Sequence, residues 1–129
     1  MHRVEETKYG YRLIFEGALD EDVTDLETDL RGRIHPKNGP FSLMMDLRKF
    51  SAFPHHIREI LKRSLFLCRE AGMERNAVVL NSAIATLQAK RLAREAGVES
   101  WSRYFDATYP DWERTALDWV VRAVEPSAP

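Results

Sequence analysis

The sequence predicts a small α/β domain with a mixed, mostly parallel sheet of about five strands and four helices. The first observation is residues 41–47, a short apolar run typical of a strand buried on both faces. The second is the amphipathic segment that follows it and carries apolar residues at helical spacing as far as Cys68. The third is that strand, loop and helix recur in this order toward the C-terminus, as in chains built from βαβ units.

The first part of the chain favours an antiparallel hairpin followed by a helix. Residues 3–7 and 11–17 have strand character, and Gly10 in the short connection can adopt positive φ. Asp20 is the expected N-cap of the first helix, which the prolines of residues 36–40 end. The core-facing residues of that helix are Val23, Leu26, Leu30 and Ile34.

The second helix is expected to begin with Pro54 in its first turn and to stop at Gly72. Residues 77–80 are the next strand, and Asn81 or Ser82 caps the third helix, which Gly97 terminates. The expected core stripe of the second helix is Ile57, Ile60, Leu61, Ser64, Leu65 and Cys68, and that of the third is Ala85, Leu87, Ala89, Leu92, Ala93 and Ala96.

The C-terminal part predicts one more strand and one more helix. Residues 101–105 are the strand, and Pro110 opens the helix. Residues 125–129 resemble a loose tail, so the domain is expected to cover residues 1–124.

Composition limits the classes of function. The chain has 129 residues, a net charge of -1 and one cysteine, Cys68, which excludes an internal disulfide. A near-neutral balance argues against non-specific attraction to nucleic acid or to an anionic membrane. No apolar run resembles a signal peptide or a spanning helix, so a cytoplasmic location is expected.

The order of these elements carries a family resemblance. Residues 11–17, 44–47, 77–80, 103–106 and 116–120 resemble the SpoIIAA-like, or STAS, family of small domains. The resemblance implies a non-enzymatic domain that binds partner proteins or small ligands, and the structurally related CRAL-TRIO group binds lipids. In anti-sigma factor antagonists of the family, a partner kinase phosphorylates a serine at the start of the second helix.

This chain departs from the family at that switch. The family's Asp-Ser-Ser-Gly motif aligns near residues 53–56, which contain no serine. Ser51 is the only hydroxyl in the loop, and Arg48 and Lys49 precede it as a kinase could require.

The loop between the third strand and the second helix, with the next strand-end loop, is the expected binding site. Ligands of open α/β sheets bind outside the carboxyl ends of the strands, where helix N-termini also present N–H groups. The expected partner- or ligand-binding residues are Asp46, Arg48, Lys49, Ser51, His55, His56, Asn81 and Ser82.

Several of these residues also have ordinary structural interpretations. Asp46 more often caps a loop or pairs with a cation such as Arg48 than acts as a catalytic carboxylate. His55 and His56 are adjacent, so on a helix they point about 100° apart and do not chelate one metal. Cys68 falls on an apolar stripe, as a buried thiol does. We expect no metal and no cofactor.

The last helix has more apolar residues than a surface helix needs. Its apolar arc spans about 200°, against about 100° for an ordinary surface helix. On the second helix Phe66 lies opposite the core stripe. The alternatives are a homodimer interface, an apolar pocket or simple burial under other segments. The candidate interface residues are Phe66, Leu117, Val121 and Val124.

Three functions remain open from the sequence. The first is a binding or regulatory module that contacts a protein partner and forms a homodimer. The second is a carrier of a lipid or apolar small molecule, with its pocket between the last helix and the sheet. The third is a small hydrolase that uses Asp46 and His55. Because no local motif couples a nucleophile to a base, a non-enzymatic protein is the preferred expectation.

Overall fold

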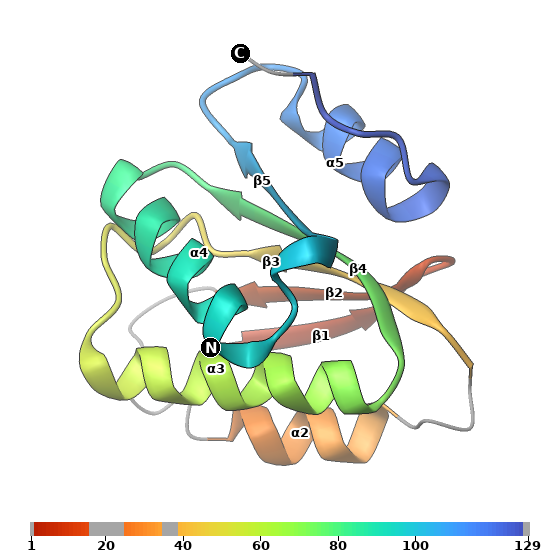
Figure 1. Cartoon of the computed structure of the whole chain (residues 1–129), viewed down its shortest axis with the longest axis vertical. Coiled ribbons are helices and arrows are strands. Elements are labelled where there is room, and N and C mark those ends of the chain that lie inside the picture. The colour runs from red at the N-terminus through yellow and green to blue at the C-terminus, as the bar shows by residue number, and fades with distance from the viewer. Residues whose placement is uncertain (1, 16–24, 35–38, 128–129) are drawn as a thin grey trace.

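A five-stranded sheet runs through the molecule in the computed structural model, which describes residues 2–15, 25–34 and 39–127 (Figure 1). The strands lie in the order in which they occur along the chain, and only the first pair is antiparallel. This confirms the predicted mixed, mostly parallel sheet. The strands are β1 (His2–Glu6), β2 (Gly10–Phe15), β3 (Phe41–Asp46), β4 (Met73–Leu80) and β5 (Ser102–Asp106).

Three helices cover one face of the sheet and a fourth covers part of the other (Figure 1). The first face carries α2 (Leu26–Arg33), α3 (His55–Glu70) and α4 (Ala83–Ala96). The opposite face carries α5 (Trp112–Arg122), and a short 3-10 turn, η2 (Glu99–Trp101), leads into β5. The four helices described here match the predicted number.

The main hydrophobic core lies between the sheet and the three-helix layer. Five of the six predicted stripe residues of α3 are buried there and Ile60 is partly buried; Cys68 is 1% exposed. A smaller core lies under α5 and consists of Met44, Ala77, Val79, Phe105, Ala116, Trp119 and Val120.

The β1–β2 hairpin depends on glycine at its turn. Gly10 has φ of 147°, and its backbone N–H and C=O pair with those of Thr7. A Cβ at this position would lie 2.1 Å from the carbonyl oxygen of Ser42 on β3. Gly10 therefore permits both the turn and the close approach of β3.

Several predicted boundaries differ from the structure by a few residues. β4 begins at Met73 and not at residue 77, because its pairing with β3 begins where Met73 lies opposite Phe41. Asn76, within this strand, is buried and donates to Ser102 Oγ at 3.2 Å. Pro54 is the N-cap of α3, and α5 begins at Trp112, two residues after Pro110. The expected N-cap Asp20 lies outside the described residues.

The ends of α4 follow the sequence prediction. Ser82 Oγ accepts a hydrogen bond from the backbone N–H of Ala85, which satisfies one of the free N–H groups of the first turn. Gly97 ends the helix in the left-handed conformation, with φ of 77°. The predicted tail begins at Glu125, whose carboxylate accepts two hydrogen bonds of 2.7 Å from Arg103.

Candidate functional site

The parallel strands end at one edge of the sheet, and two of the loops at this edge are joined by hydrogen bonds. Ser82 Oγ donates to the carbonyl oxygen of Ser51 at 2.6 Å. The Phe53 backbone N–H donates to Gln88 Oε1 at 2.7 Å, and Gln88 Nε2 donates back to the Phe53 carbonyl at 3.2 Å. These bonds attach the loop before α3 to the first turns of α4. The structure therefore brings together Ser51 and Ser82, which the sequence analysis had grouped.

Apolar side chains anchor this loop from below. Phe50 and Phe53 are each 2% exposed, and their ring centroids lie 4.8 Å apart. Phe50 also contacts Phe15 at the end of β2, at a centroid distance of 5.6 Å. Two buried aromatic rings hold the loop in place, so its exposed residues keep one fixed arrangement. Such a preformed loop surface loses less conformational entropy when it binds.

Asp46 and Arg48 belong to a different part of the edge, on the side of α5. Arg48 Nε and Nη2 donate to the two Asp46 oxygens at 2.9 and 2.7 Å, and the Arg48 guanidinium lies 4.7 Å from the centroid of Trp112 on α5. Arg12 on β2 is 3.7 Å from the same carboxylate. The predicted binding loop is therefore divided: its first residues face α5, and the rest face α4.

The charge state of Asp46 follows from these contacts. Burial acts to raise the pKa of its carboxyl group, but the hydrogen bonds from Arg48 and the charges of Arg48 and Arg12 outweigh burial and lower it. Asp46 is thus an ionised, doubly engaged carboxylate. Its hydrogen-bond donor is Arg48, and no hydrogen bond joins it to His55 in the part of the chain that the structure describes. The contact that the hydrolase hypothesis needs is not formed.

The remaining predicted residues are exposed at or near the edge. His55 borders a surface hollow of about 390 Å³ between α3 and α4, which Leu87 and Gln88 also border. Lys49, His56 and Asn81 are exposed as well. Across residues 2–15, 25–34 and 39–127, no three His, Cys, Asp or Glu side chains lie close enough together to hold a metal ion.

Two apolar residues of this edge were missed by the sequence analysis. Ile84 is 62% exposed and Leu87 is 69% exposed, and they lie one turn apart on α4. The prediction that Leu87 belongs to the core stripe is wrong, because it lies about 200° around the helix from Ala85, on the face away from the sheet. The sequence alone gives this angle. The buried stripe of α4 consists of Leu92 and the small residues Ala85, Ala89, Ala93 and Ala96.

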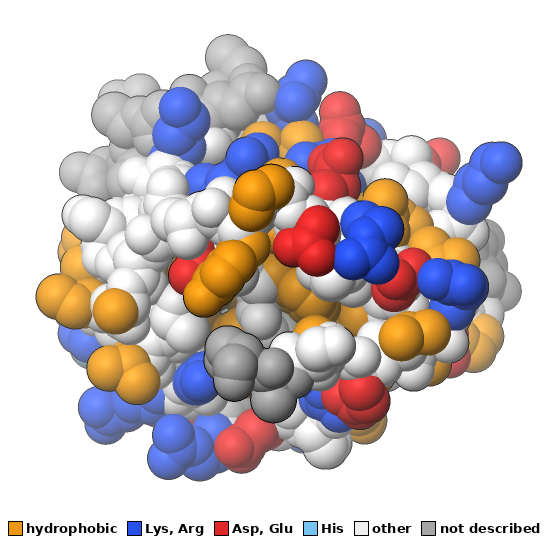
Figure 2. Space-filling model, turned by 90° about the horizontal axis from the view of Figure 1, so that it is seen from above, with side chains coloured by type: hydrophobic (Ala, Val, Ile, Leu, Met, Phe, Trp, Pro, Cys, Tyr) orange, Lys and Arg blue, Asp and Glu red, His pale blue; other side chains and the backbone are white. Residues whose placement is uncertain are grey.

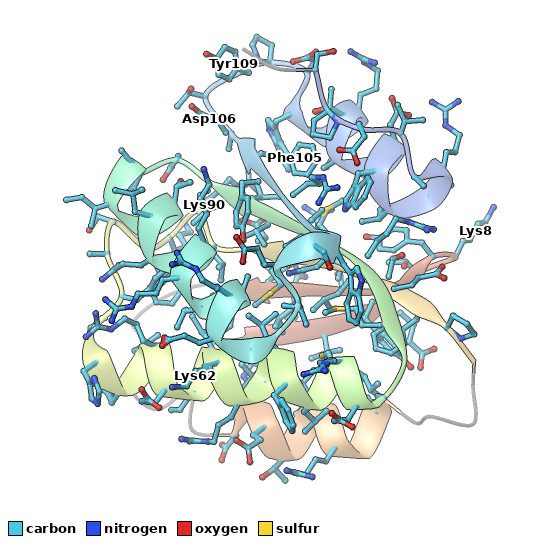
Figure 3. All side chains as sticks on the ribbon, viewed as in Figure 1. Lys8, Lys62, Lys90, Phe105, Asp106 and Tyr109 are labelled. Carbon is cyan, nitrogen blue, oxygen red and sulfur yellow. The ribbon has the colours of Figure 1, made fainter. Side chains whose placement is uncertain are left out.

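At the end of β5 the edge is formed by a polar turn. Asp106 Oδ1 accepts hydrogen bonds from the backbone N–H and the hydroxyl of Thr108, and these bonds lower the pKa of its carboxyl group. Tyr109, in the same turn, is 56% exposed. Figure 3 shows Asp106 and Tyr109 together beyond the end of β5, with Phe105 below them beside α5. Asp106 therefore has a structural role in this turn.

The side chains of the smaller core fill the space between α5 and the sheet. A hollow of about 420 Å³ lies beside it, between β5, α5 and residues 124–127. Its border combines four carboxylates with aromatic side chains, so it is a mixed surface hollow and not an enclosed apolar cavity. The void among the core residues of the other face is about 10 Å³, which is too small for any ligand. The four carboxylates are Asp106, Asp111, Asp118 and Glu125.

The residues predicted as an interface are all exposed. Phe66 on α3 is 49% exposed, and Leu117, Val121 and Val124 at α5 are between 38% and 54% exposed. They lie on two separate surfaces, because α3 and α5 are on opposite faces of the sheet (Figure 1). Viewed from above, one side of the molecule shows hydrophobic side chains in several separate groups among charged ones (Figure 2).

The Cys68 thiol is buried in the main core. Burial raises the pKa of the Cys68 thiol to about 12, so a reactive thiolate is not formed near neutral pH. None of the helices in the described ranges has both the length and the apolar character required to span a bilayer.

Comparison of the chain with protein-family models, with curated proteins and with solved structures found no match. The resemblance to the STAS family therefore stays a prediction from the sequence.

Proposed function

We propose that this protein is a non-enzymatic, cytoplasmic binding module of the STAS type that contacts a protein partner through the edge surface. The edge surface consists of Ser51, His55, Ser82, Ile84 and Leu87. The observation that carries the proposal is the exposure of Ile84 and Leu87, at 62% and 69%, beside a loop fixed by hydrogen bonds. Two neighbouring aliphatic side chains left in water at a strand-end surface are typical of a protein contact.

The polar groups around this pair fit the same function. His55 and Gln88 border the hollow next to Leu87, together with charged residues of α3 and α4. Interfaces commonly combine an apolar centre with a polar rim that excludes water. The edge surface has that composition, which supports a protein partner rather than a small apolar ligand.

The two alternative functions receive less support. A carrier needs an enclosed apolar cavity of several hundred Å³. The hollow beside α5 is bordered by carboxylates as well as aromatic side chains, and the larger hollow beside Phe66 lies at the surface and is lined largely by charged residues. A hydrolase that uses Asp46 and His55 needs a free carboxylate, whereas both Asp46 oxygens accept hydrogen bonds from Arg48.

The test compares partner capture by three forms of the protein. Wild type, the double variant Ile84→Asp/Leu87→Asp and the control Val121→Asp are used as baits, and the captured proteins are quantified by mass spectrometry. All three substituted residues are more than half exposed, so each variant is expected to fold. We expect a partner that wild type and Val121→Asp retain and the double variant loses at least about tenfold. Equal capture by all three would place the contact elsewhere and refute the proposal.

A second experiment separates binding from catalysis. The purified protein is incubated with generic ester substrates, and the rate of wild type is compared with that of His55→Ala. We expect no turnover by either form. Turnover by wild type that disappears in His55→Ala would contradict a non-enzymatic function.

A further inference from the structure

A second surface lies on the outer side of α3, away from the edge surface. Phe66 lies opposite the buried stripe of this helix and is 49% exposed. It borders a surface hollow of about 640 Å³ that is lined by residues of α2, of α3 and of the last turn of α4. Ile34, Leu67 and Ala71 supply apolar lining, and most of the other lining residues are charged. An apolar centre with a charged border is the pattern of an interaction surface.

The charges on either side of Phe66 are opposite in sign. Lys62 precedes Phe66 by four residues and Glu70 follows it by four, so the three side chains follow one ridge of the helix. Figure 3 shows Lys62 on α3, on the side of the molecule away from Asp106 and Tyr109. Lys62 Nζ lies 3.2 Å from Glu59, while Glu70 forms no ion pair with any residue that the structure describes.

This arrangement is complementary to itself under a twofold rotation. In a symmetric contact of two antiparallel helices centred on Phe66, the residue four positions before the centre faces the residue four positions after it. Lys62 of each copy then faces Glu70 of the other, and both pairs form at once. The same rotation places Arg63 of each copy opposite Arg69 of the other. Glu27 of the same chain lies 2.9 Å from Arg63 and offsets its charge, and the Arg69 guanidinium lies 5.9 Å from the centroid of the Phe66 ring, at the crossing point.

We infer that the outer face of α3 binds a second copy of this chain, with the two α3 helices antiparallel and crossing at Phe66. The argument for this occupant is the exposed Phe66 at the centre together with Lys62 and Glu70, which match a copy of themselves in one orientation. The contact leaves the edge surface accessible, so the inference stands independently of the proposed function.

Charge reversal tests the inference directly. The mass of each form is measured by sedimentation at 10 to 100 μM, a range chosen for contacts of micromolar affinity. Lys62→Glu alone and Glu70→Lys alone each create two like-charge contacts, and dimerisation should weaken about tenfold or more. The double variant Lys62→Glu/Glu70→Lys should dimerise like wild type.

Mixing the two single variants tests the symmetry of the contact. A mixed dimer of Lys62→Glu with Glu70→Lys has two pairs of opposite charge, so dimers should reappear when the two solutions are combined. Phe66→Asp should be monomeric and Val121→Asp, on the other face, should be unaffected. A wild-type monomer at 100 μM, a dimer that survives Phe66→Asp, or the absence of rescue on mixing would overturn the inference.

Discussion

The two faces of the sheet are covered to very different extents. On the face of α2, α3 and α4 the helices extend over all five strands, and the core includes Val4 of β1. On the other face α5 packs against β3, β4 and β5, and its small core includes no residue of β1 or β2. The strands reflect the difference: all residues of β3 are buried, whereas buried and partly exposed residues alternate along β2.

The unequal cover of the two faces explains both the continuous apolar run of β3 and the alternating pattern of β2. A strand that is covered on both sides has apolar residues in succession, and a strand that is covered on one side alternates. β2 accordingly places Leu13 in the core and Arg12 on the side of α5, where it lies 3.7 Å from Glu113. The alternation of β2 thus indicates a face that one helix cannot cover.

The largest expected effect compares a substitution in the main core, under three helices, with one in the smaller core under α5. Leu61→Ala removes a side chain packed within the three-helix layer, where neighbours on several elements restrict collapse of the cavity. We expect a loss of about 3–5 kcal/mol in the free energy of unfolding. Met44→Ala, under the single helix α5, should lose about 2–3 kcal/mol, because α5 can move toward the sheet. Urea denaturation measures both values. A loss at Met44 as large as that at Leu61 would contradict the proposed difference.

An intermediate effect is expected at the ion pair on the side of α5. Asp46→Asn weakens the two hydrogen bonds from Arg48 and should reduce the free energy of unfolding by about 1–3 kcal/mol at pH 7. The pKa of Asp46 is lowered in the folded protein, so its contribution is present above the ordinary carboxyl pKa of about 4 and is lost as pH falls through the folded value. The difference in the free energy of unfolding between wild type and Asp46→Asn should therefore become smaller in acid. If this difference is constant from pH 7 to pH 3, the charge of Asp46 contributes nothing to the stability of the fold.

The smallest expected effect is at Val121 of α5, and its buried neighbour Val120 provides the contrast. Val120 is 1% exposed and Val121 is 54% exposed. Val120→Ala should destabilise the protein by about 1.5–3 kcal/mol, whereas Val121→Ala should change stability by less than about 0.5 kcal/mol. Thermal unfolding of both variants at low protein concentration checks the contrast. A marked loss in Val121→Ala would indicate that another segment covers this side of α5.

Much of the fold could be predicted from the sequence, because apolar periodicity and end signals agree along most of the chain. Gly97 and Ser82 mark the ends of α4 as their chemistry requires. The start of β4 could not be found in this way, since Asn76 is polar and its burial depends on Ser102, far along the chain. Leu87 is apolar but lies about 200° around the helix from Ala85, so its angular position and not its apolar character decides its exposure.

The candidate site was predictable only in its location. The parallel strands require that the loops after β3 and β4 meet at one edge, and Ser51 and Ser82 are joined there. The division of that loop between two faces depends on the contact of Arg48 with Trp112, which lies 64 positions away along the chain. The apolar pair Ile84 and Leu87 becomes a site candidate only once its exposure is known.

The order of the strands has a consequence for how the chain is made. Each strand from β2 onward pairs with the strand that precedes it in the sequence, so none has to enter between two strands that are already paired. The sheet can therefore grow in the direction of synthesis, one strand at a time, as the chain leaves the ribosome. The antiparallel β1–β2 hairpin is the most local of these pairings and can form first. Under this scheme the α5 layer is added last, after every strand beneath it is in place.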